Sequence, residues 1–558
     1  MTRKNLTIFF LFAIIGSTIL FVVKGLMITD ISLSDECHQI ATAYRFWQGD
    51  SPLVDDWSSE QLHGLVLLPV LSPFLAFTKS TEGVVLYLRI VYLLLKFVVA
   101  IWAFYKLKNK NNIMNILFGI LLWYFFSPYN IDTLTYQAMP LIMLMIAVVI
   151  LYAEEPKPWE CIVSGAVYAL SVLSQPFWVI SYIPILVFLF LKRTTMKKFL
   201  LFFHIGIGTI FILFCAVVLI NSSVTEIIDN IIFIIEEQDH DLSGLGLYGI
   251  LYQKVWLVFI TLIRENKFVS VINLLYICIL ACAKTYRERL KIGMPICLSL
   301  SIISMFFLKK PFLMNEFFIP FIWMGVENML FVLKKCKYMQ LFFLGILFSI
   351  AIALGTNTGK LATSASLCIL AVIVLFFGDY EGLSKKEKNF NNCLMFTVLL
   401  LGLGLRIIIT WGGVITPVCY EYRICDGPMK GMFASVGLYN QYYEIWDDVQ
   451  SMNLDTQDIL FCGTSTPLAY LDAEVEFGTM GTPFFKLNYK RYEDYLLLHP
   501  EKHPTIVYFY EIADDDRNNL FFSRLIELND IEYRGKRLII RMRRDRSISL
   551  HSNMSIMK

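Results

Sequence analysis

The feature that most constrains the fold is a repeated alternation of long apolar runs with short basic clusters. A helix that crosses a bilayer needs about 20 mainly apolar residues. Hydrophobic residues make up 57% of the chain and charged residues 17%, with a mean hydropathy of +0.60. Because a soluble domain carries about 25% charged residues, this composition predicts an α-helical polytopic membrane protein.

The basic clusters indicate how the chain is threaded through the membrane, because loops rich in Lys and Arg stay cytoplasmic. These clusters are Lys106–Lys110, Lys157, Lys192–Lys198, Lys284–Lys291, Lys334–Lys337 and Lys385–Lys388. Thirteen spans, with the N-terminus inside and the C-terminus outside, place every cluster on the cytoplasmic side. The expected spans are 5–28, 83–105, 112–127, 134–153, 159–175, 177–191, 198–220, 268–283, 292–308, 312–333, 338–354, 362–378 and 393–412.

Two apolar stretches are assigned to the outer membrane surface instead. Residues 64–79 are short and contain Pro69 and Pro73. If they spanned, the cluster Lys106–Lys110 would lie outside, so we expect a broken juxtamembrane or re-entrant piece. Residues 244–263 contain Lys254 and follow an acidic stretch, which predicts an amphipathic helix lying on the outer face.

The composition changes after Trp411 to that of a soluble domain. Strand-like runs at 458–462, 505–511 and 536–541, together with a helical stretch at 488–498, predict a small α/β domain. We therefore expect a transmembrane domain over 1–412 and an extracytoplasmic domain over 413–558. The latter has neither a glycine-rich phosphate fingerprint nor a complete GxSxG motif. Its basic tail, Arg541–Arg546, is either a solvated end or a contact for anionic headgroups.

The twelve cysteines point to no metal or redox motif. Most lie in apolar spans, where they act as small hydrophobic side chains, and none forms a CxxC pair. Cys419 and Cys425 lie six residues apart in the expected outer domain. They are either a disulfide, which an oxidising compartment would permit, or two free thiols.

The first outer loop, residues 29–82, concentrates negative charge between the first and second full spans. Its acidic residues up to position 63 are Asp30, Asp35, Glu36, Asp50, Asp55, Asp56 and Glu60. Charged groups at such a boundary are costly unless they face water, a metal or a partner. The whole chain has a net charge of only +2, so nothing indicates binding to nucleic acid.

The adjacent pair Asp35-Glu36 is the sharpest local signal in this loop. It opens a helical pattern in which Ile40, Tyr44 and Trp47 share one face. An acidic residue at this position has two interpretations. It could cap the helix, since Asp is a favoured N-cap residue, or it could do chemistry at the membrane surface.

The order of features in this loop resembles the GT-C superfamily of polytopic glycosyltransferases, which use sugars linked to polyprenyl phosphates. The resemblance rests on the first span, the Asp35-Glu36 pair, the aromatic-rich helix, Gly49-Asp50-Ser51-Pro52, Asp56-Trp57 and the Pro-containing apolar run. Protein O-mannosyltransferases, aminoarabinose transferases and oligosaccharyltransferases belong to this superfamily. The thirteen-span layout and the outer C-terminal domain match it more loosely.

The resemblance implies that Asp35, with Glu36 as the adjacent candidate, acts as the catalytic base or metal-linked activator. An acceptor hydroxyl or amine must lose a proton as it attacks the anomeric carbon, and a positioned carboxylate can accept it. Some family members use a second acid in the next outer loop, which corresponds to Asp132. Asp132 could equally cap the following span. Glu316, a few residues into its span, is a further acidic candidate.

A lipid phosphate as leaving group needs a positive charge beside it. The candidates for this role are Arg89, Lys360 and the pair Lys309-Lys310. Arg89 lies about two turns into its span, where an unpaired charge is costly, and this favours a role for it. Lys360 could instead anchor a helix end by extending towards the headgroups.

A metal site in the first loop is conceivable, although part of the superfamily works without one. Asp35, Glu36, Asp55 and Asp56 could supply oxygen ligands, which favour Mg²⁺ or Mn²⁺. His38 and His63 flank these acids, and His38 could complete a set with Asp35 and Glu36.

The sequence therefore predicts transfer of a sugar from a polyprenyl-phosphate-linked donor to a glycan, glycolipid or protein acceptor on the outer face. Short loops and the absence of an evident retention signal favour a bacterial inner membrane. A polysaccharide polymerase or ligase is the alternative enzyme, but its late outer loop is usually rich in arginine. A transporter or flippase would show internal repeats, which are not evident here. A non-catalytic scaffold is also left open.

Overall fold

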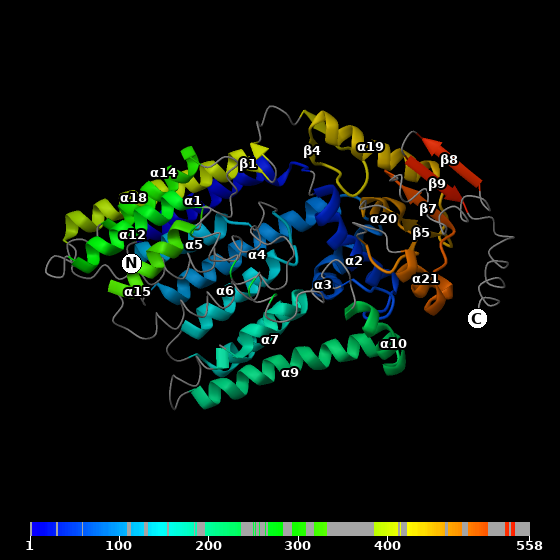
Figure 1. Ribbon diagram of the computed structural model, residues 1–558, viewed down its shortest axis with the longest axis horizontal. Helices are drawn as coiled ribbons and strands as arrows, with labels where there is room; N and C mark the ends of the chain where they lie inside the picture. The colour runs from blue at the N-terminus through cyan, green and yellow to red at the C-terminus, as the bar shows by residue number, and fades with distance from the viewer. Residues whose placement is uncertain are drawn as a thin grey trace. The chain divides into compact units, whose positions relative to one another are not determined.

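The three-dimensional structure, a computed structural model, is mainly helical and contains a small β-sheet (Figure 1). It describes residues 3–29, 32–58, 60–108, 113–127, 132–152, 156–183, 185–186, 196–235, 249, 252, 256, 263, 266–282, 293–308, 317, 319–331, 384–410, 413–414, 421–463, 467–482, 489–511, 530–534 and 537–541.

Helices occupy the predicted spans wherever the structure describes them. They are α1 (Arg3–Leu20), α4 (Val84–Leu107), α5 (Ile113–Phe125), α6 (Ala138–Tyr152), α7 (Pro158–Ser174), η4 (Pro176–Ser181), α9 (Met196–Asn221), α12 (Lys267–Cys282), α14 (Gly293–Leu308), α15 (Ile319–Phe331) and α18 (Lys385–Ile408). The expected spans 338–354 and 362–378 and most of 244–263 lie outside the described residues. The total of thirteen spans stays a prediction.

Four described helices are long and apolar enough to cross a membrane: α3 (Gln61–Thr78), α4, α9 and α18. The prediction that the prolines break residues 64–79 is wrong, because α3 runs through both Pro69 and Pro73, and the juxtamembrane position of this segment stays a prediction. The helix packs closely on α2 (Cys37–Gln48) at Gly64, where an added Cβ would lie 2.8 Å from Thr42 Cγ2. Tertiary packing of this kind offsets the hydrogen bonds that proline removes.

The last span also begins earlier than predicted. Helix α18 starts at Lys385 rather than at residue 393, so it includes the basic cluster Lys385–Lys388. The amide of Ser384 donates to Glu387 Oε2 at 2.7 Å, and the amide of Glu387 donates to Ser384 Oγ at 3.4 Å. This reciprocal capping box begins the helix ahead of the apolar run.

The chain forms two compact units. The first contains Met1–Gly25, Val91–Leu213 and Gln238–Pro417, and the second contains Leu26–Ile90, Phe214–Glu237 and Val418–Lys558. In the first unit, α7 and α9 approach closely at Gly165 and Gly206. A Cβ at Gly165 would lie 1.9 Å from Phe203 O, and one at Gly206 would lie 2.0 Å from Ile162 O. Glycine at both positions lets the two backbones touch.

The second unit contains a five-stranded sheet with the order β6-β5-β7-β9-β8, of which Figure 1 labels β5, β7, β9 and β8. Its strands are β5 (Ile459–Cys462), β6 (Glu476–Phe477), β7 (Ile506–Phe509), β8 (Asp530–Arg534) and β9 (Arg537–Arg541). Strand β5 pairs in parallel with β6 and β7, and β9 pairs antiparallel with β7 and β8. Strands β5, β7 and β9 and helix α21 (Tyr489–Leu498) confirm the three predicted strands and the predicted helix.

The core of this sheet includes Trp57, which comes from the first outer loop. Trp57 packs with Phe461, Tyr492 and Tyr495, and Phe233 of α10 (Val224–Ile235) stacks on its ring at 4.4 Å. The first loop and the C-terminal segment therefore fold as one unit. The predicted boundary at residue 412 concerns which residues lie outside the membrane, and it stays a prediction. In that segment Cys425 is a free thiol, and Cys419 lies outside the described residues.

Candidate active site

The Asp35-Glu36 pair lies where a π-helical turn, η2 (Ser32–Glu36), continues into α2. Glu36 occupies the N-cap position, but its side chain accepts no hydrogen bond from a backbone amide of the helix. Asp35 makes no hydrogen bond or ion pair with any other described side chain and is exposed to solvent. Helix capping therefore accounts for neither carboxylate.

Glu36 is almost wholly buried and is paired with Arg89. Arg89 Nε donates to Glu36 Oε1 at 2.9 Å, and Nη2 donates to Oε2 at 2.6 Å. Arg89 Nη2 also donates to Ser32 Oγ, and Nη1 donates to the carbonyl of Met27. All three guanidinium nitrogens thus have protein acceptors, and Glu36 carries a neutralising partner. A role of Arg89 towards a lipid phosphate stays a prediction.

Asp35 lies in a different electrostatic environment, shared with His38 and Glu60. The protein packed around the carboxyl group raises the pKa of Asp35 above its ordinary value. The charge of His38 opposes this shift in the pKa, and the negative charge of Glu60 adds to it. An exposed carboxylate with a raised pKa has the properties of a proton acceptor.

The position of His38 is fixed by threonines from two segments. His38 Nδ1 lies 2.5 Å from Thr482 Oγ1, and Thr42 Oγ1 lies 2.7 Å from the same hydroxyl. The other ring nitrogen, Nε2, faces Glu60 Oε2 at 3.4 Å. This network positions His38 and Glu60, whose charges act on the pKa of Asp35. His63 is buried within α3.

The structure places Asp55 and Asp56 in a separate network around Arg45. Arg45 Nη1 donates to Asp56 Oδ2 at 3.2 Å, and Nη2 donates to the carbonyl of Asp55 at 2.8 Å. Asp56 Oδ1 accepts from the amide and hydroxyl of Ser58. Asp50 binds both Arg45 Nε and Lys502 Nζ, at 2.6 and 2.5 Å. Both carboxylate oxygens of Asp56 therefore have partners that stabilise the loop.

The metal set predicted from Asp35, Glu36 and His38 does not converge among the described residues. The physical reason is that Arg89 takes both carboxylate oxygens of Glu36. Asp55 lies elsewhere, beside His499.

The first unit contains a buried cationic cluster that the sequence analysis missed, formed by Lys24, Lys96 and Arg406 around Asp132. Arg406 forms an ion pair with Asp132, which also accepts from Ser127 Oγ at 2.6 Å. The charges of all three cations act on the Asp132 carboxylate. All four side chains are buried. Three basic side chains are therefore gathered around one carboxylate.

Arg406 has unused donors in this cluster. Only 2% of its surface is exposed, and its Nε and Nη1 atoms have no hydrogen-bond partner among the described residues. Lys96 donates to the carbonyl of Phe126 and lies over the rings of Tyr92 and Trp123, at 5.1 and 5.3 Å from their centroids. Buried basic side chains, together with Arg406 donors that have no partner among the described residues, fit an anion such as a phosphate.

The other predicted site residues, Glu316, Lys360 and Lys309-Lys310, lie outside the described residues. The signal that could have revealed the cationic cluster was the presence of Lys24, Lys96 and Arg406 inside apolar runs. An intramembrane charge is by default a candidate for function.

No protein-family model and no curated protein sequence matches this chain. Among solved structures, the crystal structure of ArnT from Cupriavidus metallidurans in the apo state is similar. The match covers 97% of this chain and 98% of that chain, with 10% sequence identity and a TM-score of 0.42.

Proposed function

We propose that this protein is a membrane glycosyltransferase of the GT-C type. It would transfer a sugar from a polyprenyl-phosphate-linked donor to a hydroxyl or amine of a glycan, glycolipid or protein. The observation that carries this proposal is that two adjacent carboxylates lie in different environments. Glu36 is buried and neutralised by Arg89, whereas Asp35 is exposed, unpaired among the described side chains and has a raised pKa.

Asp35 is the catalytic base in this proposal. As the acceptor oxygen or nitrogen attacks the anomeric carbon, its proton passes to the Asp35 carboxylate. The bond from the anomeric carbon to the donor phosphate breaks, and its electron pair leaves with the lipid phosphate. A base works best when its pKa lies near the operating pH, so a raised pKa suits this task.

Glu36 and Arg89 are positioning residues in this proposal. Their ion pair joins the start of α2 to α4 and orients the turn that presents Asp35. Because the pair is buried, loss of either partner would leave a charge without compensation. Such a loss would displace the neighbouring carboxylate.

The cationic cluster of the first unit is proposed to bind a phosphate group, and this assignment is independent of the one made for Asp35. Lys24, Lys96 and Arg406 lie around Asp132, and the Nε and Nη1 donors of Arg406 have no partner among the described residues, so an anion could bind them. Positive groups held in a low dielectric stabilise a bound phosphate strongly. Asp132 would keep the cations correctly placed when no donor is bound.

The orientation in the membrane is part of the proposal. All six basic clusters fall on one side if the N-terminus lies inside and α3 does not cross the membrane, and the first loop and C-terminal segment then lie outside. We propose a bacterial inner membrane as the location. Cysteine labelling at exposed positions such as Trp47→Cys in intact cells tests the sidedness. Labelling only after the membrane is opened would overturn it.

The decisive experiment replaces Asp35 by Asn in the full-length protein. The expected result is a loss of sugar transfer by about 10²- to 10⁴-fold, because a general base contributes about that much. Transfer is measured from a labelled polyprenyl-phosphate sugar in detergent and by the surface glycans of cells. Asp447→Asn is the matched control, since Asp447 is an exposed carboxylate in the same unit.

Normal transfer by Asp35→Asn at normal expression would reject the catalytic assignment. Movement of the intact lipid-linked sugar across vesicles, without transfer, would favour the transporter alternative. The expected contribution of Mg²⁺ or Mn²⁺ is tested in the same assay by chelation and re-addition of each ion.

A further inference from the structure

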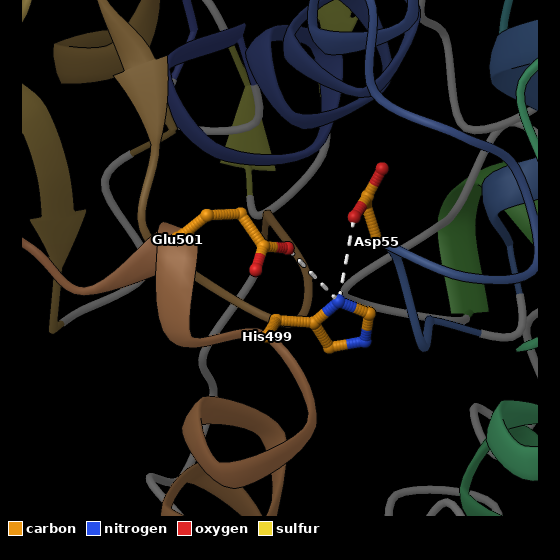
Figure 2. Close-up of side chains that lie close together, drawn as sticks. All are labelled: Asp55, His499 and Glu501. Atoms are coloured by element: carbon orange, nitrogen blue, oxygen red, sulfur yellow. Dashed lines mark ion pairs between the residues drawn. The ribbon is translucent and has the colours of Figure 1, made fainter.

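Three potential metal ligands converge at the end of α21, away from the pair Asp35-Glu36. His499 Nδ1 faces Glu501 Oε1 at 3.4 Å and Asp55 Oδ1 at 3.6 Å. Figure 2 shows both carboxylates directed towards this one ring nitrogen. His499 is almost wholly buried, whereas the Glu501 side chain is 62% exposed, so the group is reachable from solvent.

The hydrogen bonds of the other ring nitrogen determine the tautomer of His499. Its Nε2 lies 3.0 Å from Asn230 Oδ1. That oxygen also accepts from Trp57 Nε1 at 2.7 Å, and Asn230 Nδ2 donates to the carbonyl of Glu226 at 2.8 Å. Since Asn230 Oδ1 can only accept, Nε2 carries the hydrogen. In the neutral ring, Nδ1 then presents a lone pair to two carboxylates.

A lone pair facing two carboxylates is unfavourable unless a cation lies between them. The separations of 3.4 and 3.6 Å are too long for good N–H···O bonds, which measure about 2.7–3.2 Å. Two ligands bound to a tetrahedral Zn²⁺ at about 2.1 Å lie about 3.4 Å apart. The three donor atoms all lie within 4.8 Å of one another, so one ion could contact all of them.

The charges of the surrounding side chains are compatible with a bound divalent cation. Arg45 and Lys502 are balanced by Asp50 and Asp56, with which they form close ion pairs. Asp55 and Glu501 then remain beside His499 without an ion pair to Lys or Arg among the described residues. The secondary contacts are also those of a metal centre, since Asp55 Oδ2 accepts from the amide of Ser51 at 2.5 Å and Asn230 orients the histidine.

We propose that Asp55 Oδ1, His499 Nδ1 and Glu501 Oε1 bind a divalent transition-metal ion, with Zn²⁺ as the preferred ion. A nitrogen and two carboxylate oxygens form a ligand set that zinc accepts, and a water molecule would occupy the fourth position on the solvent side. The ion would tie the first outer loop to the turn that follows α21. This role is independent of sugar transfer.

The competing explanation is a protonated His499 that attracts both carboxylates without any metal. The two explanations differ in the number of zinc ions expected per chain and in the effect of replacing the exposed Glu501 on zinc affinity. The full-length protein is purified in detergent, stripped with a chelator and titrated with Zn²⁺. The expected result is one zinc per chain, a higher melting temperature, and the visible absorption of four-coordinate cobalt when Co²⁺ replaces zinc.

Glu501→Gln is the test variant, because the Glu501 side chain is 62% exposed and its replacement is expected to leave the core undisturbed. Its zinc affinity is expected to fall by about tenfold or more, as loss of a ligand exceeds the effect of losing a supporting contact. Glu476→Gln is the matched control on β6 and should bind zinc normally. Absence of stoichiometric zinc in the wild type, or equal affinity in Glu501→Gln and wild type, would overturn the proposal. Sugar transfer is assayed separately, so neither outcome decides the proposed function.

Discussion

Arg89 and Glu36 are joined by two parallel hydrogen bonds, from Nε to Oε1 at 2.9 Å and from Nη2 to Oε2 at 2.6 Å. Both side chains are almost fully removed from solvent. This contact links two residues that are 53 positions apart and decides how two adjacent acids differ. One carboxylate becomes part of the scaffold, and its neighbour Asp35 is left open to solvent.

The first prediction concerns the stability that depends on this pair. Arg89→Met leaves the Glu36 carboxylate buried without a counter-charge, and we expect a loss of about 3–5 kcal/mol in the free energy of unfolding. Denaturation of the detergent-solubilised protein measures it. The exposed pair Lys430–Glu82 is the control, and Lys430→Met should cause no measurable change. A similar, negligible effect for Arg89→Met would show that the buried pair is not a structural element.

The second prediction concerns the pH dependence of sugar transfer. A base is active when it has lost its proton, so activity falls as the pH drops through the pKa of Asp35. The negative charge of Glu60 helps to raise that pKa. Glu60→Gln should therefore lower the pKa of Asp35 and move the acidic limb of the kcat/KM profile to lower pH.

His38→Gln should have the opposite effect, because the charge of His38 lowers the pKa of Asp35. The acidic limb then moves to higher pH. Glu476→Gln is the control and should leave the profile unchanged. If the acidic limb stays in place in both Glu60→Gln and His38→Gln, Asp35 is not the group that the profile reports.

The third prediction concerns Asp472 in α20 (Leu468–Ala473), whose two carboxylate oxygens are buried without a hydrogen-bond partner among the described residues. Burial raises the pKa of Asp472 well above its ordinary value, and the charge of Glu474 adds to this shift. Above about pH 4 the unfolded chain loses this proton while the folded protein retains it. Stability conferred by the protonated group is therefore lost as the pH rises.

Asp472→Asn removes that dependence. We expect the variant to be more stable than the wild type at pH 7 by about 1–3 kcal/mol, with the difference shrinking towards pH 4. Melting temperatures measured across this range test the sign. Asp447→Asn serves as the exposed control. A variant that is less stable at pH 7, with the same pH slope as the wild type, would mean that Asp472 is charged and paired.

The fourth prediction concerns the proposed phosphate site. Arg406→Gln removes one positive charge and two unused donors, while its amide can still reach Asp132. We expect the KM for the lipid-linked donor to rise by about 10- to 100-fold, which corresponds to a charged hydrogen bond of about 1.5–3 kcal/mol. Arg406→Lys keeps the charge and should lose less. An unchanged KM in Arg406→Gln would remove this cluster from the donor site.

Local patterns in the sequence were sufficient for much of the fold. Apolar runs of sufficient length predict α4 and α9, because a bilayer demands a minimum length of apolar helix. Short runs of aromatic and β-branched residues predict β5 and β7 for a similar local reason. Strand β6 has only two residues and carries no such pattern, so it depends on pairing with β5.

The sequence by itself determined the helical membrane class, the three longer strands and the concentration of acids in the first loop, since each depends on neighbouring residues. Only the tertiary structure decided which acid is free. Arg89 selects Glu36 over Asp35, and Trp57 enters a core made by residues some 400 positions away. Lys24, Lys96 and Arg406 likewise come from three separate helical segments. Electrostatic and packing energies depend on distance in space, which spacing along the chain does not specify.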